Sequence, residues 1–88
     1  MKLVINSDYG GFSLSEKALN MYKELTGYIP YDFQRNDPIL VKIVEELAEE
    51  ANGYFADLKV IEIPDDVDWV LCEYDGREWV AERHRTWD

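Results

Sequence analysis

The fold of this chain is decided near its start, by the stretch Lys2-Leu3-Val4-Ile5-Asn6-Ser7-Asp8-Tyr9-Gly10-Gly11-Phe12-Ser13-Leu14-Ser15-Glu16. The apolar run after Lys2 predicts a short strand over residues 2–6, and the glycines predict a turn over residues 7–13. Ser13 and Glu16 match a capping box with Ser13 as N-cap, so a helix is expected to open at Leu14 or Ser15. The chain therefore starts as strand, glycine-bearing turn and helix.

Two helices are predicted from apolar side chains that recur three and four residues apart. The first ends near Thr26, with Gly27 as its C′ residue. The second begins with Asp37 as N-cap and Pro38 in its first turn, and ends at Asn52-Gly53. The apolar positions are Leu14, Ala18, Tyr22 and Leu25 in the first helix, and Leu40, Ile43, Val44, Leu47 and Ala51 in the second.

Three further strands are predicted over residues 58–63, 68–74 and 77–84. Asp75-Gly76 separates the last two, and this dipeptide is typical of a type I′ hairpin turn. The turn sets the register, with Tyr74 opposite Arg77, Cys72 opposite Trp79 and Val70 opposite Ala81. We assign the face that carries Val70, Cys72, Trp79 and Ala81 to the core, and expect Cys72 to be a buried, inert thiol.

The order β-α-α-β-β-β predicts a single domain, residues 1–88, of the α/β (α+β) class. We expect one four-stranded mixed sheet with both helices on one face, its first strand parallel to residues 58–63 through a right-handed crossover. The second face of the C-terminal β-hairpin would then be uncovered in a monomer. That apolar patch predicts an interface, for a homo-oligomer or a partner, formed by Trp69, Leu71 and Val80.

The charge balance excludes whole classes of partner. Nineteen acidic and nine basic side chains give a net charge of −10, which argues against binding to nucleic acid or to an anionic membrane. Cys72 is the only cysteine and His84 the only histidine, so no disulfide and no metal site is expected. Without a signal-peptide pattern, a cytoplasmic location is expected.

The glycine-bearing turn is a candidate ligand site. Backbone N–H groups of Gly10 and Gly11 and the Ser13 hydroxyl are suited to an anion beside a helix N-terminus. The rings of Tyr9 and Phe12 are suited to stacking on a base. The alternative interpretation is a tight strand-to-helix turn in which Ser13 is only a cap.

The C-terminal segment holds the second candidate, because Arg83, His84 and Arg85 form the densest positive cluster of an acidic chain. Arg83 and Arg85 share a strand face and are suited to bidentate capture of phosphate. The alternative is that both arginines pair with neighbouring carboxylates.

No residue pattern predicts catalysis. Asp8, His84 and either Ser13 or Ser15 would compose a triad only on paper, since no nucleophile elbow surrounds either serine. Cofactor motifs are also absent from the sequence. The chain is therefore expected to be a binding protein and not an enzyme.

The sequence resembles a family of small uncharacterised bacteriophage and prophage proteins over nearly its whole length. The resemblance rests on Tyr9-Gly10-Gly11-Phe12-Ser13-Leu14-Ser15, Ala51-Asn52-Gly53, Ala56-Asp57-Leu58-Lys59-Val60, Ile63-Pro64-Asp65-Asp66-Val67, Tyr74-Asp75-Gly76, Glu78-Trp79-Val80-Ala81-Glu82 and His84-Arg85-Thr86-Trp87. It implies a phage accessory protein that acts in the host-cell cytoplasm against host defence.

Two functions follow from these interpretations. The first is sequestration of a small phosphorylated or nucleotide-derived ligand by Tyr9, Gly10, Gly11, Phe12 and Ser13 together with Arg83 and Arg85. The alternative is an acidic module that binds and inhibits a host defence protein through the face of Trp69, Leu71 and Val80 or through the acidic second helix. A folded domain without a pocket is the third possibility.

Overall fold

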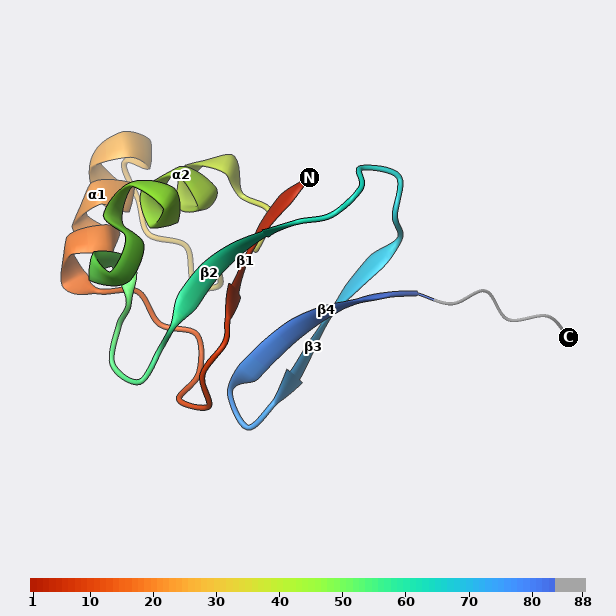
Figure 1. Cartoon of the computed structure of the whole chain (residues 1–88). Helices are drawn as coiled ribbons and strands as arrows, with labels where there is room; N and C mark the ends of the chain where they lie inside the picture. Colours follow the sequence, from red (N-terminus) through yellow and green to blue (C-terminus); the bar gives the residue numbers. More distant parts are fainter. Residues whose placement is uncertain (84–88) are drawn as a thin grey trace, which may run out of the picture.

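A computed structural model describes residues 1–83 and has the α+β architecture shown in Figure 1. The predicted order β-α-α-β-β-β is confirmed, with one short 3₁₀ helix added after the second α-helix. Within the described part of the chain, no helix is long and apolar enough to cross a membrane. The elements are β1 (Lys2–Asn6), α1 (Glu16–Thr26), α2 (Pro38–Leu47), η1 (Ala48–Ala51), β2 (Leu58–Glu62), β3 (Trp69–Tyr74) and β4 (Arg77–Glu82).

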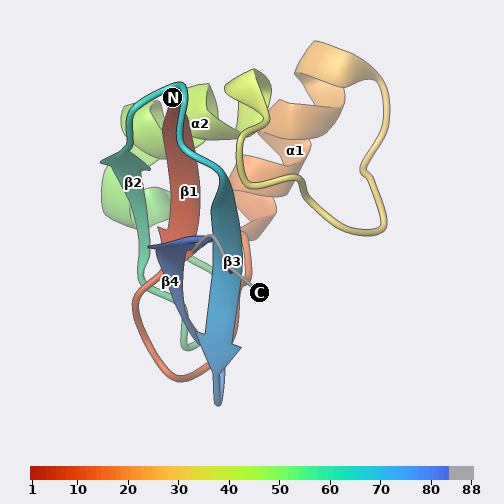
Figure 2. The ribbon, with the colours of Figure 1, turned by 90° about the vertical axis from the view of Figure 1, so that its right-hand side faces the viewer.

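The elements stack in three layers (Figures 1 and 2). Both helices cover one face of the β1–β2 pair, as predicted, and the β3–β4 hairpin lies on the other side. Val4 belongs to the apolar cluster formed with the helices. Leu3 and Ile5 are equally buried, and alternation along a strand points them to the opposite face, where the hairpin lies. β1 is thus the central, doubly covered strand.

The predicted parallel pairing of residues 2–6 with 58–63 is wrong, because β1 and β2 are antiparallel with Asn6 opposite Leu58. A single crossover helix would return the chain to the end of the sheet where β1 begins. Two consecutive helices instead run out and back, so β2 starts beside the end of β1. The hydrogen bond from the Ser7 N–H to the Asp57 carbonyl, 2.8 Å long, continues the pairing there.

The predicted four-stranded sheet is also wrong, since the strands form two separate pairs, β1–β2 and β3–β4. The reason lies on the free edge of β1. The Val4 N–H donates to the Arg35 carbonyl (2.8 Å), and the Asn6 N–H donates to Oε1 of Glu78 (3.0 Å). A loop carbonyl and a side-chain carboxylate therefore take the two donors that a β4 ladder would need.

The hairpin has the predicted register, and its Asp75-Gly76 turn has positive φ at both positions (52° and 93°), as a type I′ turn requires. The assignment of its faces, however, is wrong. Trp79 is exposed, and Val70, Cys72 and Ala81 are only half-buried. The sequence pattern could not distinguish the two faces, because both carry apolar side chains. In the structure, the face that carries Glu78 turns inward.

A buried ion pair joins the hairpin to the rest of the molecule, the body. The Arg35 guanidinium donates to both carboxylate oxygens of Glu78, at 2.7 and 3.3 Å, and both side chains are largely buried. Arg35 also donates to the Phe33 carbonyl (2.8 Å) and lies over the Phe12 ring, 3.7 Å from its centroid. Each hydrogen bond of the Glu78 carboxylate is thus made with a residue of the body.

The helix boundaries follow local chemistry with two corrections. Ser15, not Ser13, is the N-cap of α1, and its Oγ accepts from the Ala18 N–H (3.1 Å). Asp37 caps α2 and Gly27 ends α1 in the left-handed region, both as predicted. The second α-helix ends at Leu47, because Ala48 adopts a positive φ of 51° and η1 follows it.

Candidate functional site

Three loops pack together at one end of the molecule, and glycines allow the approach. A Cβ built on Gly10 would lie 2.0 Å from the Phe55 Cβ, and one built on Gly76 would lie 2.3 Å from the Tyr9 carbonyl oxygen. Any side chain there would clash with backbone or with a fixed side chain. The glycine-bearing turn, the 53–57 loop and the hairpin turn therefore form one surface, at the bottom of Figure 1.

Asn6 is the polar centre of this end. Its side chain is fully buried, and its Nδ2 donates to the carbonyls of Asp8 (2.8 Å) and Gly76 (2.7 Å). Its Oδ1 accepts from the backbone N–H of Asp57 (2.9 Å) and more weakly from that of Asp8 (3.3 Å). One amide thus satisfies backbone groups of all three loops, which fixes their relative positions.

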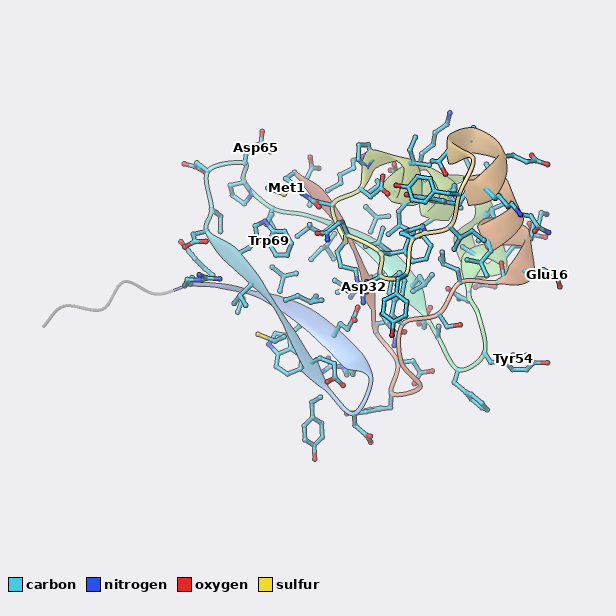
Figure 3. All side chains as sticks on the ribbon, turned by 180° about the vertical axis from the view of Figure 1, so that it is seen from behind. Met1, Glu16, Asp32, Tyr54, Asp65 and Trp69 are labelled. Carbon is cyan, nitrogen blue, oxygen red and sulfur yellow. The ribbon has the colours of Figure 1, made fainter. Side chains whose placement is uncertain are left out.

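The surface of this end is aromatic. Five large rings that are 41% to 89% exposed project from the three loops and the adjoining strand. We call this set the aromatic end; its members are Tyr9, Tyr54, Phe55, Tyr74 and Trp79. Figure 3 shows Tyr54 pointing away from the molecule. Tyrosine and tryptophan at this density on a surface are typical of binding sites, where they supply large rigid contacts.

Phe55 adds a conformational signal. Its φ is 61°, in the left-handed region where a bulky L-residue is an outlier. The ring is 77% exposed and lies 6.1 Å, centroid to centroid, from that of Tyr54. An exposed apolar ring on an unfavourable backbone conformation contributes little to folding, and such positions cluster at functional sites.

The charge around the aromatic end is mostly negative. Four exposed carboxylates belong to the same three loops and the adjoining strand, and the accompanying basic side chain is Arg77, next to Gly76. The acidic residues are Asp8, Asp57, Glu73 and Asp75. Their potential opposes a phosphate and favours a basic surface.

The residues predicted at the glycine-bearing turn are only partly available. Tyr9 is exposed, but the Phe12 ring is covered by the Arg35 guanidinium. Ser13 accepts the Gly53 N–H through its carbonyl (2.9 Å), and a Cβ on Gly53 would meet its Oγ. The turn is also separate from the start of α1, so Gly10 and Gly11 do not extend the helix N-terminus.

Of the predicted arginines, Arg83 is described by the structure, and it does not join that turn within one chain. Arg83 follows β4 at the end opposite to Gly76, and seven extended residues span roughly 23 Å. Its Nε lies 3.8 Å from the Asp68 carboxylate, with both side chains largely exposed. Arg85 and His84 lie outside the described residues. Arg77, which the sequence interpretation passed over, is the arginine beside the glycines.

The predicted interface residues lie on the inward face of the hairpin. Trp69, Leu71 and Val80 are half-buried rather than uncovered. Trp69 and Leu71 line a small open hollow against residues 32–35. This hollow is separate from the aromatic end.

Sequence reasoning missed Asn6, Tyr54, Phe55, Tyr74, Arg77 and Trp79, the last of which it assigned to the core. The run Gly53-Tyr54-Phe55 was the one available signal, because two aromatic residues in a turn without periodicity have no core position to fill. Among residues 1–83, no cluster of three or more histidine, cysteine or carboxylate side chains is arranged to hold a metal ion. Comparison with protein-family models, curated proteins and solved structures gives no match to this chain.

Proposed function

We propose that this chain is a non-enzymatic protein-binding module whose aromatic end docks on a basic surface of a partner protein. The observation that carries the proposal is the group of five exposed rings on three loops and the ends of the adjoining strands, where one buried asparagine holds the loops together. Such a surface is preorganised, so binding would require little ordering of the chain. The resemblance to phage proteins supports a host defence protein as the partner.

Charge favours this proposal over sequestration of a nucleotide-like ligand. Among residues 1–83, a phosphate at the glycine-bearing turn would meet the four carboxylates named above and Arg77 as their accompanying cation, whereas a basic protein surface would be attracted by the same carboxylates. Ligand sequestration by this turn would require a further cation, supplied by a second copy or by residues 84–88. Ligand sequestration is the alternative function, and the experiment below distinguishes it from protein binding.

The test is capture of a partner from host-cell extract by the immobilised chain, compared among the wild-type chain and two variants. Tyr74→Ser removes a ring of the aromatic end. Tyr31→Ser is the matched control, because Tyr31 is fully exposed on the separate 28–36 segment. We expect the wild-type chain and Tyr31→Ser to retain the same host protein, and Tyr74→Ser to lose it. Salt should release it, since the attraction is electrostatic.

Two results contradict the proposal. Equal capture by Tyr74→Ser and Tyr31→Ser would place the contact elsewhere. Alternatively, native mass spectrometry of the chain isolated from infected cells could find a retained phosphorylated small molecule and no protein. That finding would favour sequestration.

A further inference from the structure

The outer edge of β3 is open. The Arg83 N–H donates to the Asp68 carbonyl (2.7 Å). Because hydrogen-bonded and non-hydrogen-bonded pairs alternate along an antiparallel ladder, the backbone N–H and C=O groups of Val70 and Cys72 point toward β4. The backbone groups of Trp69, Leu71 and Glu73 therefore point away from β4. Across the described chain, no hydrogen bond occupies these N–H groups. An unpaired edge of this kind is a template for another strand.

A hollow lies beside this edge. It has a volume of about 200 Å³ and is lined by Trp69 and Leu71 on the hairpin and by residues 32–35 on the body. In Figure 3, Trp69 stands at the start of β3 and Asp32 lies across from it on the body. Drug-sized ligands occupy roughly 300–1,000 Å³, so this hollow suits a single side chain better than a whole small molecule.

The chemistry of the hollow selects a cation. Trp69 offers the aromatic face that attracts ammonium and guanidinium groups most strongly, and Asp32 is an exposed carboxylate. Glu82 pairs with Trp69 across the hairpin and adds a second carboxylate nearby. Arg35 also lines the hollow, but both oxygens of Glu78 neutralise its guanidinium.

A second copy of this chain is the less favourable occupant of the edge. Each copy has a net charge of −10; β3 contains Glu73, and Asp68 immediately precedes the strand. Pairing two β3 edges would bring these like charges together, and like charges opposite each other destabilise a sheet. A basic extended segment meets the same edge with complementary charge.

We propose that β3 binds an extended basic segment of a partner by strand addition, with one arginine or lysine side chain in the hollow between Trp69 and Asp32. The backbone of the segment pairs with Trp69, Leu71 and Glu73, which supplies affinity without sequence preference. The cation in the hollow supplies the specificity. This site shares none of the five rings of the aromatic end, and Glu73 is the one surrounding carboxylate that belongs to both, so it extends the proposed function to a second contact.

The probe is a blocked pentapeptide in which two arginines alternate with threonine and valine, titrated into the full ¹⁵N-labelled chain and followed by NMR. We expect the largest shifts at the amides of Trp69, Leu71 and Glu73 and at the Trp69 indole N–H. A matched peptide with citrulline in place of arginine keeps the shape and loses the charge. It should bind about tenfold more weakly. A third peptide, with methylated backbone nitrogens, should not bind.

Asp32→Asn tests the hollow, with Asp66→Asn as the control for net charge, since Asp66 is an exposed carboxylate outside the hollow. Only Asp32→Asn should weaken binding of the arginine peptide. Equal affinity for the arginine and citrulline peptides, equal effects of the two variants, or absence of binding overturns the proposal. So does a sedimentation result in which the chain self-associates and protects β3. None of these outcomes bears on capture by the aromatic end.

Discussion

The body and the β3–β4 hairpin are held together by different forces. The body buries a continuous apolar cluster in which Leu40, Ile43 and Val4 are fully enclosed. In the hairpin, by contrast, Glu78 is the one residue of the two strands that is buried. Hydrophobic burial dominates in the first region, whereas the hairpin combines half-buried apolar side chains over Leu3 and Ile5 with hydrogen bonds and one buried ion pair. The comparison teaches that a few buried polar contacts can position a hairpin whose own apolar side chains are only half-buried.

This difference has a consequence for dynamics and binding. A two-stranded hairpin is marginally stable alone, so its order depends on the contacts of Glu78 and Gly76 with the body. Regions of low local stability are those from which binding surfaces are usually drawn. Both proposed contacts, the aromatic end and the open β3 edge, use the hairpin.

Removal of the Glu78 carboxylate is expected to have the largest effect. Glu78→Ala leaves the Arg35 charge buried without its partner and the Asn6 N–H without an acceptor, a change that costs about 3–5 kcal/mol. Because the lost contacts join the hairpin to the body, the hairpin should undock first. We expect hydrogen exchange at Cys72 and Trp79 to accelerate by at least about a hundredfold.

Leu40→Ala is the matched change in the body, where it should lower the free energy of unfolding by about 2–5 kcal/mol. Exchange should then accelerate in both regions, since the hairpin cannot remain docked on an unfolded body. If Glu78→Ala also accelerated exchange around Leu40 to the same degree as in the hairpin, the two regions would be one cooperative unit, and the comparison would fail.

A medium effect on the free energy of unfolding is expected when the Tyr22 hydroxyl, in the body, is removed. Its hydroxyl donates to Oδ2 of Asp37 (2.5 Å) while Oδ1 of the same carboxylate caps α2. This hydrogen bond, with burial and the Asp37 charge, raises the pKa of Tyr22 above its ordinary value. A raised phenol pKa means that the folded chain holds the proton more tightly. The stabilisation is therefore complete below about pH 10 and is lost as the pH rises further.

Tyr22→Phe should lower the free energy of unfolding by about 1.5 kcal/mol at pH 7 and remove the decline above pH 10 that this phenol causes. Urea denaturation between pH 7 and pH 11 measures both quantities. Tyr31→Phe, at a fully exposed position, should change neither. An alkaline decline in Tyr22→Phe as steep as in the wild-type chain would contradict the assignment to Tyr22.

The smallest effect is a gain in stability. Phe55 and Ala48 both have positive φ, at 61° and 51°, and glycine relieves this strain by about 0.5–1 kcal/mol in each case. Phe55→Gly should raise the melting temperature and abolish partner capture, because it removes a ring of the aromatic end. Ala48→Gly, at the end of α2, should raise the melting temperature and leave capture intact. Destabilisation by Phe55→Gly would show that the ring has a structural role.

Much of the fold could be predicted from local chemistry. The Asp75-Gly76 turn and the caps at Asp37 and Gly27 were all identified, because each depends on residues adjacent in the chain. The candidate site was recognised only at Tyr9, Gly10 and Gly11. Phe55 and Gly76, the neighbour of Arg77, reach this surface through contacts between distant segments, which no local pattern records.

The inward face of the hairpin shows most clearly what a local sequence pattern cannot predict. Its two faces are similarly apolar, so hydrophobic alternation could not select between them. The Glu78 carboxylate determines which face turns inward, because it accepts hydrogen bonds from Arg35 and from the Asn6 N–H in the body.

By itself, the sequence determined the elements, their order, the hairpin register and an acidic chain without a metal-binding or catalytic motif. These properties follow from spacing, backbone preference and composition, which act over a few residues or over the whole chain at once. The tertiary structure alone decided that β1 and β2 are antiparallel, that the strands form two pairs, and that the glycines hold three loops together. Those outcomes depend on which distant groups satisfy each other's hydrogen bonds, as Asn6, Arg35 and Glu78 do here.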